Sequence, residues 1–150
     1  MRAPTRRTLC LFAGAIWLAS GPGTAEPVVS TEDARAIRQV IEAQLAAFRA
    51  DNAERAFSYA SPSIRAMFGS ADSFIAMVRG GYPVVYRPAS VSFMLPETAA
   101  GATPGEVIQR VRMTDGGGAA WLAIYSMQRQ PDRRWRINGC VATRDAGRTA

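Results

Sequence analysis

Residues 80–95 read GGYPVVYRPASVSFML, and the chain changes there from a helical to an extended pattern. Before this stretch, apolar residues recur every three or four positions, and after it they alternate with polar residues. Pro83 and Pro88 keep the intervening residues out of a central strand, because proline cannot donate to a sheet hydrogen bond. The change of period predicts helices first and an antiparallel sheet second, which is an α+β domain.

The helical pattern is clearest after Ser30 and Thr31, either of which can cap a helix. Apolar residues then recur at three- and four-residue spacing and predict one long amphipathic helix, and they are Ile37, Val40, Ile41, Leu45 and Phe48. Three shorter helical segments follow. The first starts at the Asp51-Asn52 cap, the second runs from Ser61-Pro62 to Gly69, and the third runs from Ser70 to Gly80-Gly81.

Four strands are predicted after the change of period, in a meander. Val91, Phe93 and Leu95 alternate with polar residues in the first strand, residues 107–113 form the second, and residues 115–118 make a tight return. Both faces are apolar at the start of the third strand, residues 121–127. We therefore expect helices on one face and a partner chain, a loop or a ligand on the other. Alternation in the last strand places these residues on one face: Trp135, Ile137, Gly139 and Val141.

Residues 1–25 have the three zones of a cleavable export signal. Three arginines precede an apolar run over residues 9–19, and small residues lead to a cleavage point predicted between Ala25 and Glu26. The apolar run has about half of the roughly 20 residues that span a bilayer, so we expect no stable membrane anchor. Arg6-Arg7 leaves the twin-arginine route open beside the general secretory route, which we favour. The expected working protein is a periplasmic or secreted domain over residues 26–143, with a polar tail over 144–150.

Removal of this signal changes the charge and the cysteine content. The whole chain carries a net charge of +6, and loss of three arginines but no acidic residue leaves +3. A charge this small, in this compartment, does not favour nucleic-acid binding. Cys140 becomes the single cysteine, so no internal disulfide can form, and a buried thiol in a strand is the expected state.

Several segments resemble a bacterial family of unknown function, numbered 4864. They are the end of the first helix at Phe48-Arg49, AFSYASP at 56–62, GYPVVYRP at 81–88, AWLAIY at 120–125, and QPD with WRINGC at 130–140. The resemblance spans roughly residues 33 to 142. It implies the nuclear transport factor 2-like, or cystatin-like, superfamily, in which helices pack into the concave face of a curved antiparallel sheet. That implies a fold without an activity, since the superfamily includes both enzymes and binding proteins.

The residue content excludes several kinds of chemistry. The chain has no histidine and no lysine, which removes the usual base near neutral pH and every serine–histidine pair. With one mature cysteine and no calcium-type acidic loop, we expect no metal and no cofactor. Carboxylates and phenols remain for proton transfer, and the candidates are Asp72, Tyr59, Tyr82, Tyr86 and Tyr125.

Two kinds of function remain open. The favoured one is a non-enzymatic module that binds a small molecule or a periplasmic protein, with a homodimer as the expected assembly. Arg87 beside Tyr86 could then meet an anionic group, and the expected ligand-binding residues are Tyr82, Tyr86, Arg87, Trp121 and Tyr125. The alternative is a cofactor-free isomerase, dehydratase or hydrolase that uses an Asp/Tyr pair in the pocket.

Overall fold

A computed structural model describes residues 28–147, and it confirms the α+β class: five helices precede a four-stranded antiparallel sheet. The helices are α1 (Thr31–Arg49), α2 (Ala53–Ser58), α3 (Pro62–Phe68), α4 (Ala71–Gly81) and α5 (Pro83–Tyr86). The strands are β1 (Ser90–Phe93), β2 (Glu106–Thr114), β3 (Ala120–Arg129) and β4 (Trp135–Arg144). The expected signal, with its cleavage point at Ala25 and Glu26, lies outside the described residues.

The helices begin at the capping residues that the sequence offers. The side-chain oxygens of Ser30, Asn52, Ser61 and Ser70 each accept a hydrogen bond from a backbone N–H in the first turn of α1, α2, α3 and α4. These bonds satisfy donors that have no partner inside the helix. Gly69 ends α3 with a φ of 73°, in the left-handed region that glycine adopts without a steric penalty.

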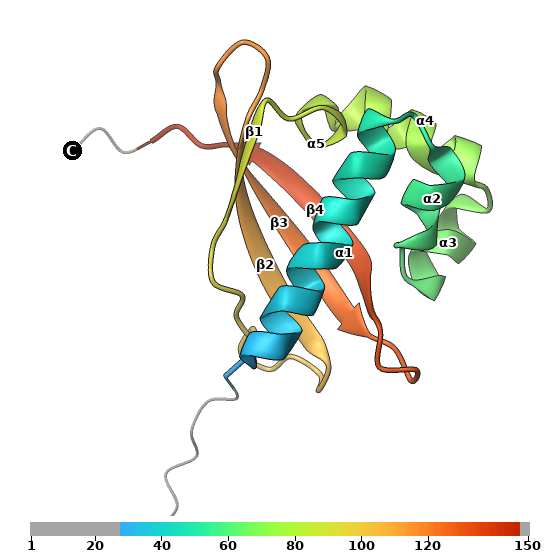
Figure 1. Ribbon diagram of the computed structural model, residues 1–150, viewed down its shortest axis with the longest axis vertical. Coiled ribbons are helices and arrows are strands. Elements are labelled where there is room, and N and C mark those ends of the chain that lie inside the picture. The colour runs from blue at the N-terminus through green and yellow to red at the C-terminus, as the bar shows by residue number, and fades with distance from the viewer. Residues whose placement is uncertain (1–27, 148–150) are drawn as a thin grey trace, which may run out of the picture.

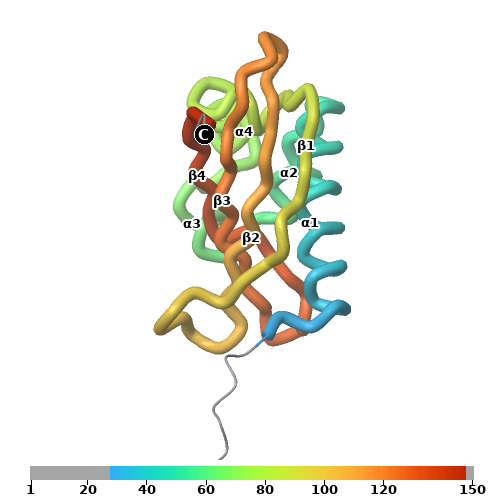
Figure 2. The backbone as a smooth tube through the Cα atoms, turned by 90° about the vertical axis from the view of Figure 1, so that its left-hand side faces the viewer, coloured from blue at the N-terminus to red at the C-terminus, as the bar shows by residue number. Residues whose placement is uncertain are grey.

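The sheet is a meander in the order β1-β2-β3-β4, and the helices cover one face of it (Figure 1). Alternate residues of β2 and β3 point into the core beneath α1, among them Val111, Ala123 and Tyr125, each fully buried. Figure 2 shows the opposite face without a helix over it. There Leu122 and Ile124 are half-buried and Val141 is 55% exposed.

The last strand departs from simple alternation. Ser126 pairs with Gly139 while Met127 pairs with Ile137, so Asn138 is an extra residue in β4. This bulge reverses the sides of the residues that follow it. Trp135 and Ile137 point into the core, but after the bulge Cys140 lies opposite Tyr125, and Val141 lies opposite Ile124 on the other face. The expectation that Trp135, Ile137, Gly139 and Val141 share one face is therefore wrong.

The structure adds one short helix that the sequence analysis does not predict, and it shortens one expected strand. Residues 83–86 form the short helix α5, because Pro83 suits a first helical position and the N–H groups of Val85 and Tyr86 bond to the Tyr82 carbonyl. The first strand ends at Phe93 rather than including Leu95, which is 90% exposed. None of the helices within residues 28–147 is long and apolar enough to cross a membrane.

Candidate functional site

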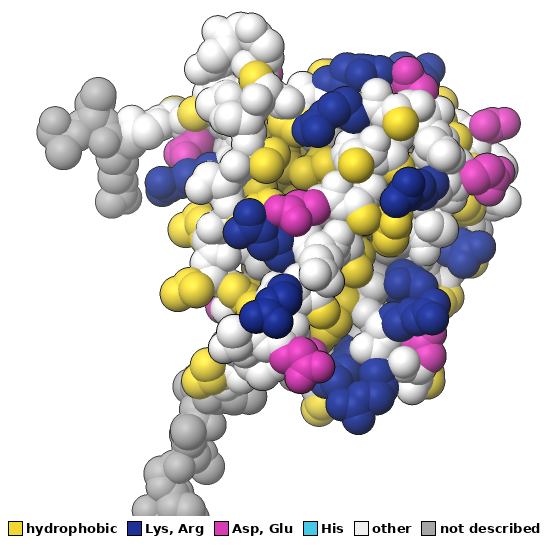
Figure 3. Space-filling model, viewed as in Figure 1, with side chains coloured by type: hydrophobic (Ala, Val, Ile, Leu, Met, Phe, Trp, Pro, Cys, Tyr) yellow, Lys and Arg dark blue, Asp and Glu magenta, His cyan; other side chains and the backbone are white. Residues whose placement is uncertain are grey.

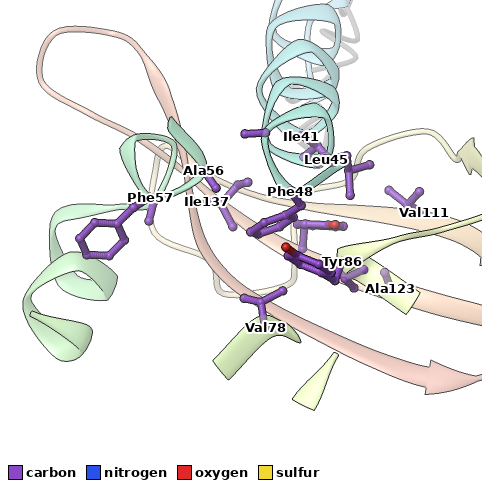
Figure 4. Packing of buried hydrophobic residues seen from close by; sticks show 14 of the residues in the cluster. Ile41, Leu45, Phe48, Ala56, Phe57, Val78, Tyr86, Val111, Ala123 and Ile137 are labelled. Atoms are coloured by element: carbon purple, nitrogen blue, oxygen red, sulfur yellow. The ribbon is translucent and has the colours of Figure 1, made fainter. Parts of the chain in front are cut away.

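A cavity of about 290 Å³, here called the β4 cavity, lies between the helices and the inner side of β3 and β4. All five helical segments or their connections contribute to its wall, and the lining is mostly apolar. Figure 4 shows three of the lining side chains, Phe48 from α1, Val78 from α4 and Ile137 from β4, lying near one another. The cavity is partly open to solvent, and its apolar lining and concave shape are typical of small-molecule sites.

The outer wall of the β4 cavity is α3. Ile64, Met67 and Phe68 line the cavity from this helix, and none of the residues of α3 is buried. Met67 is 73% exposed although it lines the cavity, so the cavity meets solvent beside it. Because α3 lies between the Ser61 cap and Gly69 and has little buried surface, it is the least firmly packed part of the wall.

The segment before α3 is joined directly to β4. Ala60 forms a parallel bridge with Ile137, the Ser61 N–H donates to the Ile137 carbonyl at 2.8 Å, and the Ile137 N–H donates to the Tyr59 carbonyl at 2.9 Å. The fully buried Ser61 hydroxyl donates to Asn138 Oδ1 at 2.7 Å. This connection occurs at the bulge in β4, so the wall from α2 to α3 is fixed to the same strand position that turns Cys140 inward.

Tyr125 and Cys140 form the polar part of the lining on the sheet side. They are direct partners in the β3–β4 register. Tyr125 is 0% exposed, and its hydroxyl is the single buried side-chain N or O atom without a hydrogen-bond partner among residues 28–147. Such a group costs about 1–3 kcal/mol of stability. Its position in a cavity wall is the most unusual polar feature of the fold.

Both groups keep their protons at neutral pH. Burial raises the pKa of the Tyr125 phenol well above its ordinary value, and the neighbouring Cys140 thiol raises it further. Burial also raises the pKa of the Cys140 thiol to about 12, although the Tyr125 hydroxyl beside it works in the opposite direction. A neutral thiol is a weak nucleophile, so this pair is suited to recognition rather than to covalent chemistry.

Gln44 supplies another polar side chain to the lining. It is 3% exposed on α1, and its Nε2 donates to the Ala56 carbonyl at 3.1 Å. The amide therefore holds α1 against α2 at the cavity. Its long side chain faces the core because it follows Ile37 and Ile41 on the buried side of α1.

The structure places two of the five expected ligand-binding residues, Tyr82 and Tyr125, in the wall of the β4 cavity. Trp121 does not line it. The indole Nε1 of Trp121 donates to Asp115 at 2.9 Å, and the Arg144 guanidinium lies 4.9 Å from the ring centroid. Asp115 also accepts from two backbone N–H groups of the β2–β3 turn. Trp121 is thus tied to that turn.

Tyr86 and Arg87, the two remaining candidates, belong to a group that we call the Asp51 corner: Asp51, Arg79, Tyr86 and Arg87. The Tyr86 hydroxyl donates to Asp51 and accepts from Arg79 at 3.1 Å, and Arg87 Nη2 donates to both Asp51 oxygens at 2.9 and 3.0 Å. The hydrogen bond from Tyr86 and the charge of Arg87 hold the pKa of Asp51 below its usual value, although partial desolvation opposes them. Arg87 is therefore already paired within the chain.

The two other candidates for proton transfer also lie away from the β4 cavity. Asp72 is exposed in the first turn of α4, where a carboxylate opposes the helix dipole, and Tyr59 is half-buried against the core. No aspartate or glutamate of residues 28–147 lines the cavity. In the same part of the chain, no three acidic or cysteine side chains gather in a group that could hold a metal ion.

Cys140 and Gln44 line the cavity, although sequence reasoning did not select them. The alternation in β4 points to Cys140 only if the bulge is recognised, and Gly139 beside Asn138 is the available signal. Gln44 could have been found as a polar residue between Ile41 and Leu45 on the apolar side of α1.

On the face drawn in Figure 3, the charged side chains of the described residues carry both signs. In the view of Figure 3, arginine side chains are spread over the face, with acidic side chains beside several of them. Ion pairs account for part of this distribution, for example Arg38 with Glu42 at 2.8 Å and the Arg110–Glu97 pair.

The family whose model matches the chain is described as Domain of unknown function (DUF4864), and the match covers residues 30–150. Neither a curated protein nor a solved structure matches the chain. The matched range contains every helix and strand described above, and with them the whole β4 cavity. The chain therefore belongs to this family of domains of unknown function.

Proposed function

We propose that this protein is exported and binds a small, largely apolar molecule in the β4 cavity. The observation that carries the proposal is the buried Tyr125 hydroxyl, which has no hydrogen-bond partner in the described part of the chain and belongs to a residue that lines a cavity of about 290 Å³. Apolar walls with a few polar groups are typical of small-molecule sites. A cavity of about 150 Å³ in another protein holds benzene, so this one has room for a substituted ring.

The cavity favours binding over catalysis. The Asp/Tyr chemistry needs a carboxylate near the phenol, and within residues 28–147 the cavity wall contains none. Tyr125 and Cys140 both stay protonated near neutral pH because burial raises the pKa of each. Neither group can then act as a general base there.

Binding of toluene, measured by calorimetry, tests the proposed site. We expect a Kd of about 1 mM or tighter for this seven-carbon molecule. Val78→Phe should abolish binding, because Val78 lines the cavity and is 6% exposed. The matched control is Ala76→Phe, an exposed position of the same helix.

Thermal unfolding of both variants separates a filled cavity from a misfolded protein, since extra volume in a core costs typically 1–3 kcal/mol. If Val78→Phe fails to fold, Ala60→Val is the smaller substitution in the same wall. Toluene that binds Val78→Phe as well as the original chain would overturn the site, and absence of toluene binding would overturn the proposal.

Export rests on the pattern of residues 1–25, with arginines, an apolar run and small residues before Ala25. Expression in a bacterial host followed by cell fractionation tests it. We expect the protein in the periplasmic fraction, with an intact mass that corresponds to a first residue of Glu26. A full-length mass in the cytoplasmic fraction would contradict the proposal.

Placement in the nuclear transport factor 2-like superfamily also stays a proposal, supported by helices that precede and cover a four-stranded meander.

A further inference from the structure

We infer that the ligand of the β4 cavity is a neutral molecule whose polar group is a hydrogen-bond acceptor, such as a ketone or ester carbonyl, held by the Tyr125 hydroxyl. This inference rests on the proposed function and names the chemical class of ligand. It comes from the absence of charge in the wall, the unpaired Tyr125 hydroxyl and the adaptable side chains of the lining.

The wall excludes a charged ligand. None of its side chains, within the described residues, is an arginine, an aspartate or a glutamate. Arg87 is the arginine that the sequence analysis expects beside an anionic group of a ligand. In the structure, its guanidinium donates to both carboxylate oxygens of Asp51 instead. A carboxylate or an ammonium group in this cavity would lose its hydration without gaining a counter-charge, which costs far more than burial of a neutral polar group.

Tyr125 supplies a donor. A phenol carries one O–H donor, and this one makes no hydrogen bond of proper geometry among residues 28–147, with only the weakly accepting Cys140 sulfur beside it. A ligand acceptor would satisfy it, whereas a ligand with only donors would leave the O–H unpaired. Cys140, the direct register partner of Tyr125, adds a weak polar group beside the hydroxyl.

The hydroxyl lies deep in the wall, so binding requires some movement of the lining. Tyr125 is 0% exposed, whereas Met67, another lining residue, is 73% exposed. Met67 and Met77 both line the cavity, and their unbranched side chains adapt readily to a ligand.

Two ligands of matched shape test the hydrogen bond: acetophenone, and α-methylstyrene, in which a CH₂ group replaces the carbonyl oxygen. The measured quantity is the ratio of the Kd of α-methylstyrene to that of acetophenone, by calorimetry on the original chain and on Tyr125→Phe. Because each ligand's own dehydration cancels between the two proteins, the change in this ratio reports the hydroxyl alone. We expect the ratio to fall at least fivefold in Tyr125→Phe.

Tyr82→Phe is the matched control, since Tyr82 lines the same cavity and is half-buried. Its ratio should stay within twofold of that of the original chain. Benzoate, the charged ligand of similar shape, should bind at least tenfold more weakly than acetophenone at pH 7.

An unchanged ratio in Tyr125→Phe would overturn the inference, and so would benzoate binding tighter than acetophenone. In both cases toluene binding would still support the proposed function. If toluene and both matched ligands fail to bind the original chain, the inference and the proposed function fall together.

Discussion

Tyr86 in α5 and Tyr125 in β3 are both buried, at 6% and 0% exposure, and their surroundings differ sharply. The Tyr86 hydroxyl donates to Asp51 and accepts from Arg79, and the guanidinium groups of Arg79 and Arg87 each lie 5.2 Å from its ring centroid. The Tyr125 hydroxyl has no partner in the described part of the chain. The hydrogen bonds of Tyr86 stabilise the fold, whereas the hydroxyl of Tyr125 forms no hydrogen bond within the described residues.

Phe48 separates these two regions. Its ring centroid lies 5.7 Å from that of Tyr86, and the same residue lines the β4 cavity. Figure 4 shows the rings of Phe48 and Tyr86 next to each other. Phe48 thus contacts the hydrogen-bonded Asp51 corner and also lines the cavity to which Tyr125, with its unpaired hydroxyl, belongs. The contrast separates a buried tyrosine whose hydroxyl is satisfied by the fold from one whose hydroxyl is not.

Phe48→Ala should have the largest effect, because it removes the ring between the two regions. Phe48 is 1% exposed and contacts Tyr86 and Phe74, so we expect a loss of about 3–5 kcal/mol in the free energy of unfolding. Urea unfolding measures it. The control is Phe68→Ala on α3, where the half-buried ring should cost less. A loss of under 1 kcal/mol for Phe48→Ala would show that the two regions do not depend on this ring.

Alkaline pH should destabilise the protein through Cys140, the register partner of Tyr125. Cys140 has a folded pKa of about 12 against a usual value of 9.0, so above pH 9 the unfolded chain releases a proton that the folded chain keeps. The folded state then binds more protons, and its stability falls by up to about 1.4 kcal/mol per pH unit as pH rises.

Cys140→Ala should flatten this loss between pH 9 and pH 10, with the Tyr125 phenol contributing above that range because burial raises its pKa too. Urea unfolding at a series of pH values provides the measurement. If the free energy of unfolding falls equally steeply with pH in the original chain and in Cys140→Ala, the Cys140 thiol does not have the raised pKa that its burial implies.

Tyr86→Phe should destabilise the protein by about 1 kcal/mol, since it removes a buried hydroxyl that is paired on both sides. The substitution should also weaken the acid dependence of stability. Asp51 has a lowered pKa, whose largest cause is the Tyr86 hydrogen bond, so its contribution is present above the unfolded pKa and is lost as pH falls. Unfolding curves at pH 7 and pH 3 check both effects, and an unchanged midpoint at pH 7 would contradict the first.

Tyr125→Phe should have the smallest effect on stability, and its sign should be opposite. Loss of an unpaired buried hydroxyl relieves a cost, so we expect the free energy of unfolding to stay the same or to rise by up to about 1 kcal/mol. The same unfolding assay compares it with Tyr86→Phe. If the two variants lose equal stability, the two tyrosines do not differ as described.

Much of the fold follows from the sequence because local signals agree with the packing. The apolar spacing over α1 and the capping residues Ser30, Ser61 and Ser70 are confirmed, as is the alternation in β2 and β3. These signals act within one helix or one strand. They do not predict that the residues after Asn138 change sides of the sheet. Asn138 becomes an extra residue only when β4 pairs with β3 and the Ala60 segment.

The candidate site was predicted only in part for a similar reason. Tyr82 and Tyr125 lie in the cavity wall, while their role as ligand-binding residues stays a prediction. Arg87 looked free in the sequence because its partner, Asp51, lies 36 residues away and was assigned to a helix cap. Asn52 makes the backbone cap of α2 instead, which leaves the Asp51 carboxylate for Arg87.

The connection between Ser61 and Asn138 bears on the order of events during synthesis. It joins positions 77 residues apart in the chain, and closing so long a loop is slow relative to forming a helix or a hairpin. A ribosome finishes the helices and the first three strands before it adds the strand that holds the cavity wall. A chain that stops short of residue 137 would contain every tyrosine of the protein and still lack the β4 cavity.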